Sequence, residues 1–271
     1  SKAFQIPFIA GSIAELYEKT RPDLVVITVN ETSMREVCVE AFKFPWRFLI
    51  EKPVGIDYEE AGYLAGLAAE RNAAVWVALN RRQHSSLKAV LSGLEQESGT
   101  RFIHILDQED HIGARAYGHP ELLVKNWMFA NSIHMVDYFD TLGRGGIAQV
   151  TPVVSWDPEN PTVVISKVTF ASGDVGLYQA IWNAPAPWTV SISTREKYFE
   201  LRPLEQATVR TATKRRAEPF PVHQWDLDFK PGFRSQAEEA IKAVRGWAHN
   251  LANLETALGT MRLINAIYFG K

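Results

Sequence analysis

The chain has 271 residues, of which 46% are hydrophobic and 22% are charged, and its formal net charge is −2. Such a composition is ordinary for a globular protein of one large domain or two smaller ones. A nucleic-acid partner is not expected, because such a surface usually needs a broad basic stripe. The densest basic stretch, residues 213–216, predicts only a solvated turn.

The sequence has no membrane-length apolar run and does not open with a signal peptide, which predicts a cytoplasmic protein with no membrane partner. The single cysteine, Cys38, excludes an intramolecular disulfide and suggests a reducing compartment. Because it lies among apolar residues in a helical pattern, we expect a buried, inert thiol rather than a nucleophile.

The first 80 residues alternate between helix and strand patterns. Ser12 and Glu15 fit a capping box, so a short helix should follow to about Thr20. The apolar, β-branched run 23–29 predicts a buried parallel strand. A helix over about 33–43, a strand at 46–50, a helix over about 57–72 and a strand at 74–79 come next. This alternation predicts a parallel sheet with right-handed crossovers.

The pattern changes after residue 80. We expect a helix over about 85–97, a strand at 101–108, a long loop at 109–126, and a helix over about 131–142 that Gly143 ends. Period-2 strands within 147–211 predict an antiparallel sheet; they lie at 162–170, 176–182, 189–193 and 197–201. Two helices, about 233–250 and 253–269, close the chain.

The tripeptide Glu51-Lys52-Pro53 follows the apolar strand at 46–50. Open α/β sheets bind ligands beyond the carboxyl ends of their strands, and Pro53 stiffens the turn there. Burial and neighbouring charge can bring the pKa of a lysine toward the working range of an acid–base group. We therefore expect Lys52 to meet a ligand; the alternative is a solvated surface lysine.

Four motifs stand in a recognisable order. Residues 25–33 form a strand and loop, Glu51-Lys52-Pro53 follows, then Asn80-Arg81-Arg82, and finally residues 132–137, Ser-Ile-His-Met-Val-Asp. In this order the chain resembles the glucose–fructose oxidoreductase, inositol dehydrogenase and MocA (Gfo/Idh/MocA) family over nearly its whole length. The resemblance implies a partial Rossmann-type parallel-sheet domain at 1–82, followed by an α+β domain with a large, mostly antiparallel sheet at 83–271.

The resemblance also implies an NAD(P)-dependent dehydrogenase that moves a hydride between a nicotinamide, NAD or NADP, and a sugar, polyol or related metabolite. Its catalytic residues would be Lys52, His134 and Asn131. Its substrate-binding residues would be Lys52, Arg81, Trp127, Asn131 and His134. Its cofactor-binding residues would be Thr28, Val29, Asn30, Met34, Glu51, Lys52 and Asn80. A homo-oligomer through the antiparallel sheet would be expected.

Two departures from the family pattern matter. The Gly-x-Gly-x-x-Gly turn that holds the pyrophosphate is absent. We favour a truncated product or a partial chain over a member that has lost this half-site, because the run 23–29 would otherwise form an exposed apolar edge. Ala130 also stands where the family has an aspartate. An alternative is therefore a lapsed member that binds a sugar or a protein partner without redox turnover.

Several residues keep two interpretations. His134 could be a core histidine, although its motif favours an acid–base role. Asn131 could be a helix N-cap or a substrate contact, whereas Asp137 is more easily explained as structural. Trp127 could stack on a ligand or lie in the core. Arg81 and Arg82 could bind a carboxylate, but a solvated or ion-paired role is more usual.

A metal site is not expected. The candidate residues match no compact ligand spacing; they are His104, Asp110, His111 and His119.

Overall fold

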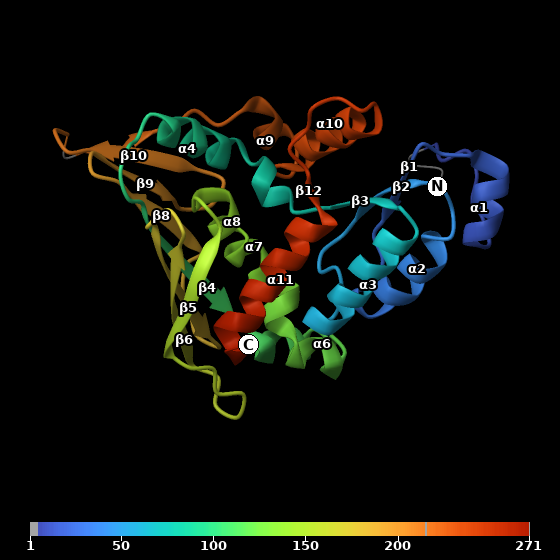
Figure 1. The fold of residues 1–271 in the computed structure, drawn as a ribbon, viewed down its shortest axis with the longest axis horizontal. Coiled ribbons are helices and arrows are strands. Elements are labelled where there is room, and N and C mark those ends of the chain that lie inside the picture. Colours follow the sequence, from blue (N-terminus) through green and yellow to red (C-terminus); the bar gives the residue numbers. More distant parts are fainter. Residues whose placement is uncertain (1–4, 215, 271) are drawn as a thin grey trace.

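The computed structural model describes residues 5–214 and 216–270, and within them the strands form two sheets, of four and eight strands. Figure 1 shows the small sheet at one end of the molecule and the large sheet at the other, with the last long helix between them. Residues 1–4 and Arg215 of the basic stretch lie outside the described residues. None of the helices described is long and apolar enough to cross a membrane.

The small sheet has the order β1-β2-β3-β12. Strands β1 (Leu24–Ile27), β2 (Arg47–Ile50) and β3 (Ala74–Val77) run parallel, as expected. The expected helices precede and connect them: α1 (Ile13–Thr20), capped by the Ser12 side chain, α2 (Met34–Ala41) and α3 (Tyr58–Glu70). A two-residue strand, β12 (Ala252–Asn253), pairs antiparallel with β3, so the end of the chain returns to the first sheet.

The prediction that residues 23–29 form a buried strand is wrong in one respect. Strand β1 lies at the edge of the sheet and pairs only with β2 among the described residues. Val26 is therefore 54% exposed, while Ile27 points into the core. An edge strand has no neighbour on its outer side, and so it buries less of its apolar surface.

The large sheet has the order β11-β10-β9-β8-β4-β7-β6-β5. Its central strand, β4 (Phe102–Glu109), runs parallel to β7 (Val175–Trp182) and antiparallel to β8 (Thr189–Ser193). All its other pairs are antiparallel, as expected. The remaining strands are β5 (Ile147–Val154), β6 (Val163–Phe170), β9 (Lys197–Leu201), β10 (Ala207–Thr211) and β11 (Glu218–Pro219).

Helix α11 (Leu254–Phe269) joins the two sheets, since it contacts α3 and β3 on one side and β5 and β6 on the other. Its buried side chains belong to the core cluster that includes residues of both sheets. Helix α4 (Ser85–Glu95) agrees with the expected helix. Helix α10 (Phe233–Val244) begins where expected but ends six residues before the expected residue 250, and Gly246 just beyond it has a positive φ of 72°. Helix α9 (Gln224–Asp228) was not expected.

Two expectations between residues 109 and 142 are wrong. The expected long loop contains α5 (His111–Ala116) and α6 (Glu121–Lys125), because the Asp110 side chain accepts a hydrogen bond from the Gly113 amide and caps a short turn. The expected single helix is divided into a π-helical turn, η4 (Met128–Ser132), followed by α7 (Ile133–Val136) and α8 (Tyr138–Leu142). Such π turns occur frequently at functional sites.

Candidate active site

Lys52 connects the small sheet to the π-helical turn. It follows β2 at the carboxyl edge of the sheet, and its Nζ donates a hydrogen bond to the Ala130 carbonyl oxygen at 2.8 Å. The residues after β1 and β3, Asn30 and Asn80, belong to the same edge, because the three strands run parallel. Lys52 therefore lies where an open α/β sheet meets its ligand.

The environment of Lys52 makes its ammonium easier to deprotonate. Burial lowers the pKa of Lys52 below its ordinary value, and the nearby charge of Arg81 lowers it further. The carboxylates of Glu31, Glu51 and Glu109 act in the opposite direction. An amine held in this balance can accept and return a proton.

His134 on α7 has an unused ring nitrogen. Its Nδ1 is buried and has no hydrogen-bond partner among the described residues. Burial holds the pKa of His134 well below its usual value, and the positive charges of Arg81 and Lys52, followed by His84 and Lys230, lower it further. The imidazole is therefore neutral near pH 7, and its Nδ1 can bind a polar group that approaches it.

Lys230, whose charge acts on His134, lies at the start of a tight loop that contacts Asn80. The Asn80 side chain donates a hydrogen bond to the Pro231 carbonyl oxygen at 3.2 Å. The next residue, Gly232, has a positive φ of 80°, and a Cβ atom there would lie 2.3 Å from the Asn80 carbonyl oxygen. Only glycine fits this close approach, and Asn80 is thus occupied by positioning the loop.

Asn131 lies on the π-helical turn next to Ala130. Its Nδ2 donates to Glu109 Oε2 at 2.9 Å, and the neighbouring Ser132 Oγ donates to Glu109 Oε1 at 2.6 Å. The Asn131 side chain caps neither η4 nor α7, so of the two interpretations kept open for this residue the N-cap is wrong.

Arg81 and Arg82 are adjacent in sequence but have different partners. The Arg81 guanidinium lies 4.8 Å from the centre of the Trp188 ring, and its Nη1 is 3.0 Å from Met135 Sδ. Among the described residues Arg81 has no ion-pair partner. Its positive charge therefore remains available beside Lys52 and His134.

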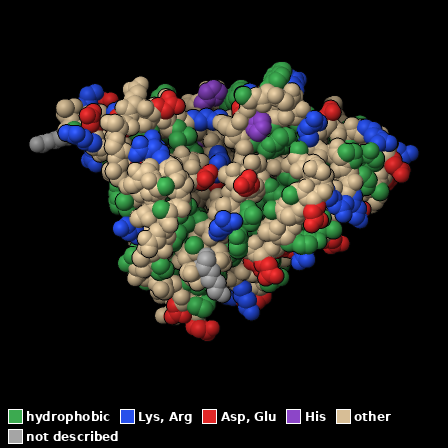
Figure 2. Space-filling model, viewed as in Figure 1, with side chains coloured by type: hydrophobic (Ala, Val, Ile, Leu, Met, Phe, Trp, Pro, Cys, Tyr) green, Lys and Arg blue, Asp and Glu red, His purple; other side chains and the backbone are tan. Residues whose placement is uncertain are grey.

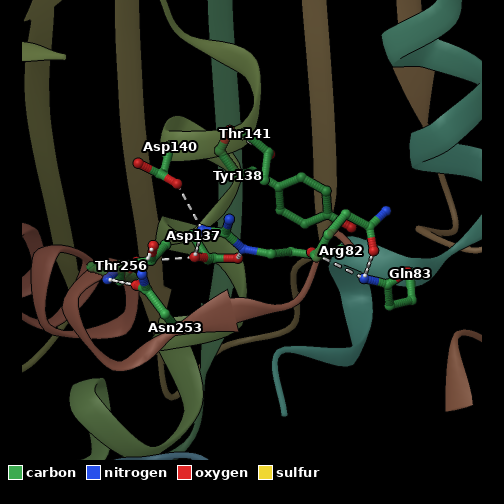
Figure 3. A network of polar contacts seen from close by, with 10 residues as sticks. Arg82, Gln83, Asp137, Tyr138, Asp140, Thr141, Asn253 and Thr256 are labelled. Atoms are coloured by element: carbon green, nitrogen blue, oxygen red, sulfur yellow. Dashed lines mark hydrogen bonds and ion pairs between the residues drawn. The ribbon is translucent and has the colours of Figure 1, made fainter. Parts of the chain in front are cut away.

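Arg82 makes the expected structural ion pair (Figure 3). Its Nε and Nη2 donate to the two oxygens of Asp137 at 2.7 and 2.6 Å, and Nη2 also donates to Asp140 at 2.8 Å. Thr260 of α11 donates to Asp137 as well. Asp137 thus joins three elements, in agreement with the structural role that its sequence context favours.

The other expected contact residues lie in different environments. Trp127 is half-buried against Ile56, Leu123 and Ala130, which fits a packing role beside the site. Thr28 and Asn30 are exposed, while Val29 and Glu51 are half-buried. Met34 needs a correction, because its side chain is fully buried against Cys38, with Sγ and Sδ 3.6 Å apart. No Met34 side-chain atom is left to contact a cofactor.

Cys38 is the buried thiol that was expected, and burial raises its pKa to about 12. The described residues contain no group of three or more metal-ligating side chains. His111 and His119 instead pack against the rings of Trp182 and Trp127.

Two buried carboxylates, Asp107 and Glu109 of β4, were not recognised from the sequence. The alternation of this strand places them on the same face as Ile103 and Ile105, and both are fully buried. The sequence did contain a signal, since a period-2 strand whose apolar face ends in two carboxylates predicts buried acids.

These observations define the class of protein: a Rossmann-type parallel sheet joined to a large, mostly antiparallel sheet, with a lysine and a histidine where the two meet. Residues 1–79 match the sequence model of GFO_IDH_MocA, described as an oxidoreductase family with an NAD-binding Rossmann fold. Over these residues the chain is similar to the Gfo/Idh/MocA family, and the match agrees with the motifs by which the sequence resembles it. No curated protein sequence matches the chain significantly.

Solved structures share the fold over almost the whole chain. A dehydrogenase from Clostridium difficile has a TM-score of 0.77 at 15% identity, and the match covers 98% of this chain and 84% of that one. UDP-N-acetylglucosamine 3-dehydrogenase from Acidithiobacillus ferrooxidans has a TM-score of 0.75 at 17% identity, with coverages of 95% and 80%. The WlbA dehydrogenase from Chromobacterium violaceum, solved with NADH and UDP-GlcNAcA, has a TM-score of 0.68 at 16% identity, with coverages of 95% and 78%.

Proposed function

We propose that the protein is an NAD(P)-dependent dehydrogenase acting on a hydroxyl group of a sugar, a polyol or a related metabolite. The observation that carries the proposal is the position of Lys52, which is held on the Ala130 carbonyl oxygen at the carboxyl edge of the parallel sheet. The lapsed interpretation is not favoured, because Lys52 keeps surroundings suited to proton transfer and His134 keeps an unpartnered nitrogen that can bind a substrate hydroxyl group.

The residues at the sheet edge fit the nicotinamide half of a cofactor. Thr28, Val29 and Asn30 follow β1, and Glu51 follows β2. The neutral His134, whose pKa the charge of Lys52 helps to lower, has an unpartnered nitrogen. When bound there, the nicotinamide would supply the hydride acceptor or donor. The protein's own task is then to place the substrate carbon and to manage the hydroxyl proton.

Lys52 and His134 divide this task. Lys52, whose pKa is lowered by burial, takes the hydroxyl proton as the carbonyl forms and returns it in the reverse direction. His134 is neutral and offers Nδ1 to hold a substrate hydroxyl group in place. Asn131 is bonded to Glu109 and therefore supports the turn that carries Ala130.

The unpaired charge of Arg81 favours an anionic substrate. Arg81, Lys52 and Lys230 all act on His134, and Arg81 has the Trp188 ring beneath its guanidinium. An arginine without a carboxylate partner suits the phosphate or carboxylate of a sugar nucleotide or a sugar acid. Two of the similar structures are named for UDP-sugars or contain one, and we propose this class as the first to test.

The experiment is a turnover assay of the chain with NAD or NADP, monitored by absorbance of the reduced nicotinamide, on a panel of UDP-sugars, sugar acids and polyols. Lys52→Ala should reduce kcat by about 100-fold or more, because it removes the proton acceptor. The control is Lys43→Ala, a surface lysine paired with Glu40. Wild-type turnover by Lys52→Ala would overturn the catalytic assignment, and no turnover by wild type on any substrate would count against the function.

We also propose two units, residues 1–82 and 83–271, and self-association through the large sheet. The outer strand β5 carries exposed apolar side chains, including Val153 at 63% exposure. On the face in Figure 2, basic and acidic side chains are interspersed with hydrophobic ones. Sedimentation velocity of the chain tests the association, and a monomer at all concentrations would contradict it.

A further inference from the structure

Asp107 and Glu109 form a buried pair of acids. They are neighbours on one face of β4, both are fully buried, and their carboxyl groups are within hydrogen-bonding reach of each other. Neither acid has an ion-pair partner among the described residues. Two adjacent carboxylates without a cation cannot both remain ionised away from water.

The hydrogen bonds of the pair leave a place for one proton. Tyr178 donates to Asp107 Oδ2 at 2.8 Å, and Ser132 and Asn131 donate to the two oxygens of Glu109. The remaining oxygen, Asp107 Oδ1, is buried and lacks a donor. A proton on Glu109 would supply that donor, so the geometry is complete only when the pair carries one proton.

The surroundings agree with a protonated Glu109. Burial, followed by the charge of Asp107, raises the pKa of Glu109 well above its usual value. The other polar groups packed on the pair are neutral: Tyr268 of α11 lies 3.1 Å from the Tyr178 hydroxyl and 3.5 Å from Ser132 Oγ. The positive charge of Arg81 acts on Asp107 and lowers its pKa, against the larger effect of burial, which raises it.

The pair is connected to Lys52 through the π-helical turn. Glu109 holds Asn131 and Ser132, the two residues that follow Ala130, and the Ala130 carbonyl oxygen receives the Lys52 ammonium. The single negative charge of the pair also acts on Lys52 through Glu109. It raises the pKa of Lys52, as Glu31 and Glu51 do, whereas Arg81 lowers it. The same two acids therefore influence both the position of the Lys52 ammonium group and its pKa.

We propose that Asp107 and Glu109 share one proton and act as a single negatively charged positioning unit, which fixes the turn that receives Lys52 and stabilises the ammonium form of Lys52. This inference rests on the proposed function of Lys52. In this arrangement the carboxylates lie on strand β4, and Glu109 is bonded to the two residues that follow Ala130.

The first test is infrared spectroscopy of the full chain at neutral pH, with neither cofactor nor substrate. The C=O band of a protonated carboxyl group should be present in wild type. It should be absent from Glu109→Gln, from Asp107→Asn and from the double variant, because one remaining acid is free to ionise. A band that is missing from wild type, or one that persists in the double variant, would overturn the shared proton.

The second test measures the pH dependence of Lys52 acylation by an amine-reactive reagent, resolved by mass spectrometry. Each single variant keeps one negative charge and should keep the wild-type midpoint. The double variant loses that charge, and its midpoint should move to lower pH by about one unit. Equal shifts in the single and double variants, or no shift in the double variant, would overturn the proposal.

The control for both tests is Glu97→Gln, which removes a carboxylate paired with Lys197 on the large sheet and should match wild type. Circular dichroism establishes that each variant is folded. If the double variant does not fold, the single variants still decide the infrared test. Both tests remain valid for a chain without turnover, so failure of the proposed function and failure of this inference are distinguishable.

Discussion

His134 is neutral because of what surrounds it. Burial has the largest effect, and four basic side chains add to it: Arg81, Lys52, His84 and Lys230. In a water-filled surface site the same imidazole would titrate close to pH 6.5. The residue therefore acts as a neutral hydrogen-bonding group in the folded protein. Keeping it neutral lowers the free energy of unfolding at low pH.

Folding lowers the pKa of His134, so below about pH 6.5 the unfolded chain binds a proton that the native chain does not. The stability linked to His134 is complete above that pH and is lost as the pH falls. His134→Gln does not titrate. The free energy of unfolding of wild type minus that of the variant should therefore fall between about pH 7 and about pH 5. Urea unfolding at each pH measures it.

Other titrating groups cancel in this comparison, because they are present in both proteins. Among them are His84, whose pKa burial also lowers, and the Asp107–Glu109 pair. A difference between wild type and His134→Gln that stays constant with pH would show that His134 is solvated rather than held neutral.

At the scale of elements, the ion pair of Arg82 and Asp137 holds the segment that follows β3 against α7 and α8. Arg82 belongs to η3 (Asn80–Gln83), directly after β3, and Asp137 also accepts from Thr260 of α11. The same η3 turn carries Arg81, so this pair helps to fix Arg81 relative to His134. The buried and exposed partners of Arg82 should differ strongly in their effect on stability.

Asp137→Ala should destabilise the protein by about 3 kcal/mol, since it leaves the buried face of Arg82 and the Thr260 hydroxyl without an acceptor. Asp140→Ala removes the solvent-exposed partner, 55% exposed, and should cost less than about 1 kcal/mol. Urea unfolding gives both values. Equal costs would mean that burial does not distinguish the two carboxylates.

The elements that the sequence predicted correctly are those with a local cause. Period-2 alternation gave β6 to β9, and the Ser12 cap gave the start of α1. The break at 128–132 has a distant cause, because Glu109 from β4 bonds to Asn131 and Ser132 there. No pattern within the helix could reveal that contact.

The sequence predicted the parts of the site that depend on a local motif and missed those that depend on tertiary packing. The motif placed Lys52 at the strand end, where the structure has it. The burial of Met34 follows from how α2 rotates onto β1, which no single motif encodes. Asp107 and Glu109 could have been predicted as buried from the alternation of β4, but their bonds to the turn beside Ala130 depend on tertiary packing.

At the scale of the whole molecule, α11 makes one core out of two sheets. It lies between them in Figure 1 and contacts α3, β3, β5 and β6. Its Tyr268 hydroxyl contacts Tyr178, which donates to Asp107, and its Thr260 donates to Asp137. The two-residue strand β12 precedes it and pairs with β3, a contact too short to have a sequence pattern.

Because both sheets pack on α11, they should lose protection together when the helix is weakened. Ile264 is fully buried, and Ile264→Ala should cost about 2–5 kcal/mol by leaving a cavity. Hydrogen exchange read by mass spectrometry should then accelerate by the same factor in β2 and in β7, because the slowest amides of both exchange through one global opening. Arg262→Ala, on the exposed side of the same helix and bonded to the Tyr58 hydroxyl, should change both by little. Acceleration of only one strand would show that the sheets unfold separately and that α11 belongs to the stability of one of them alone.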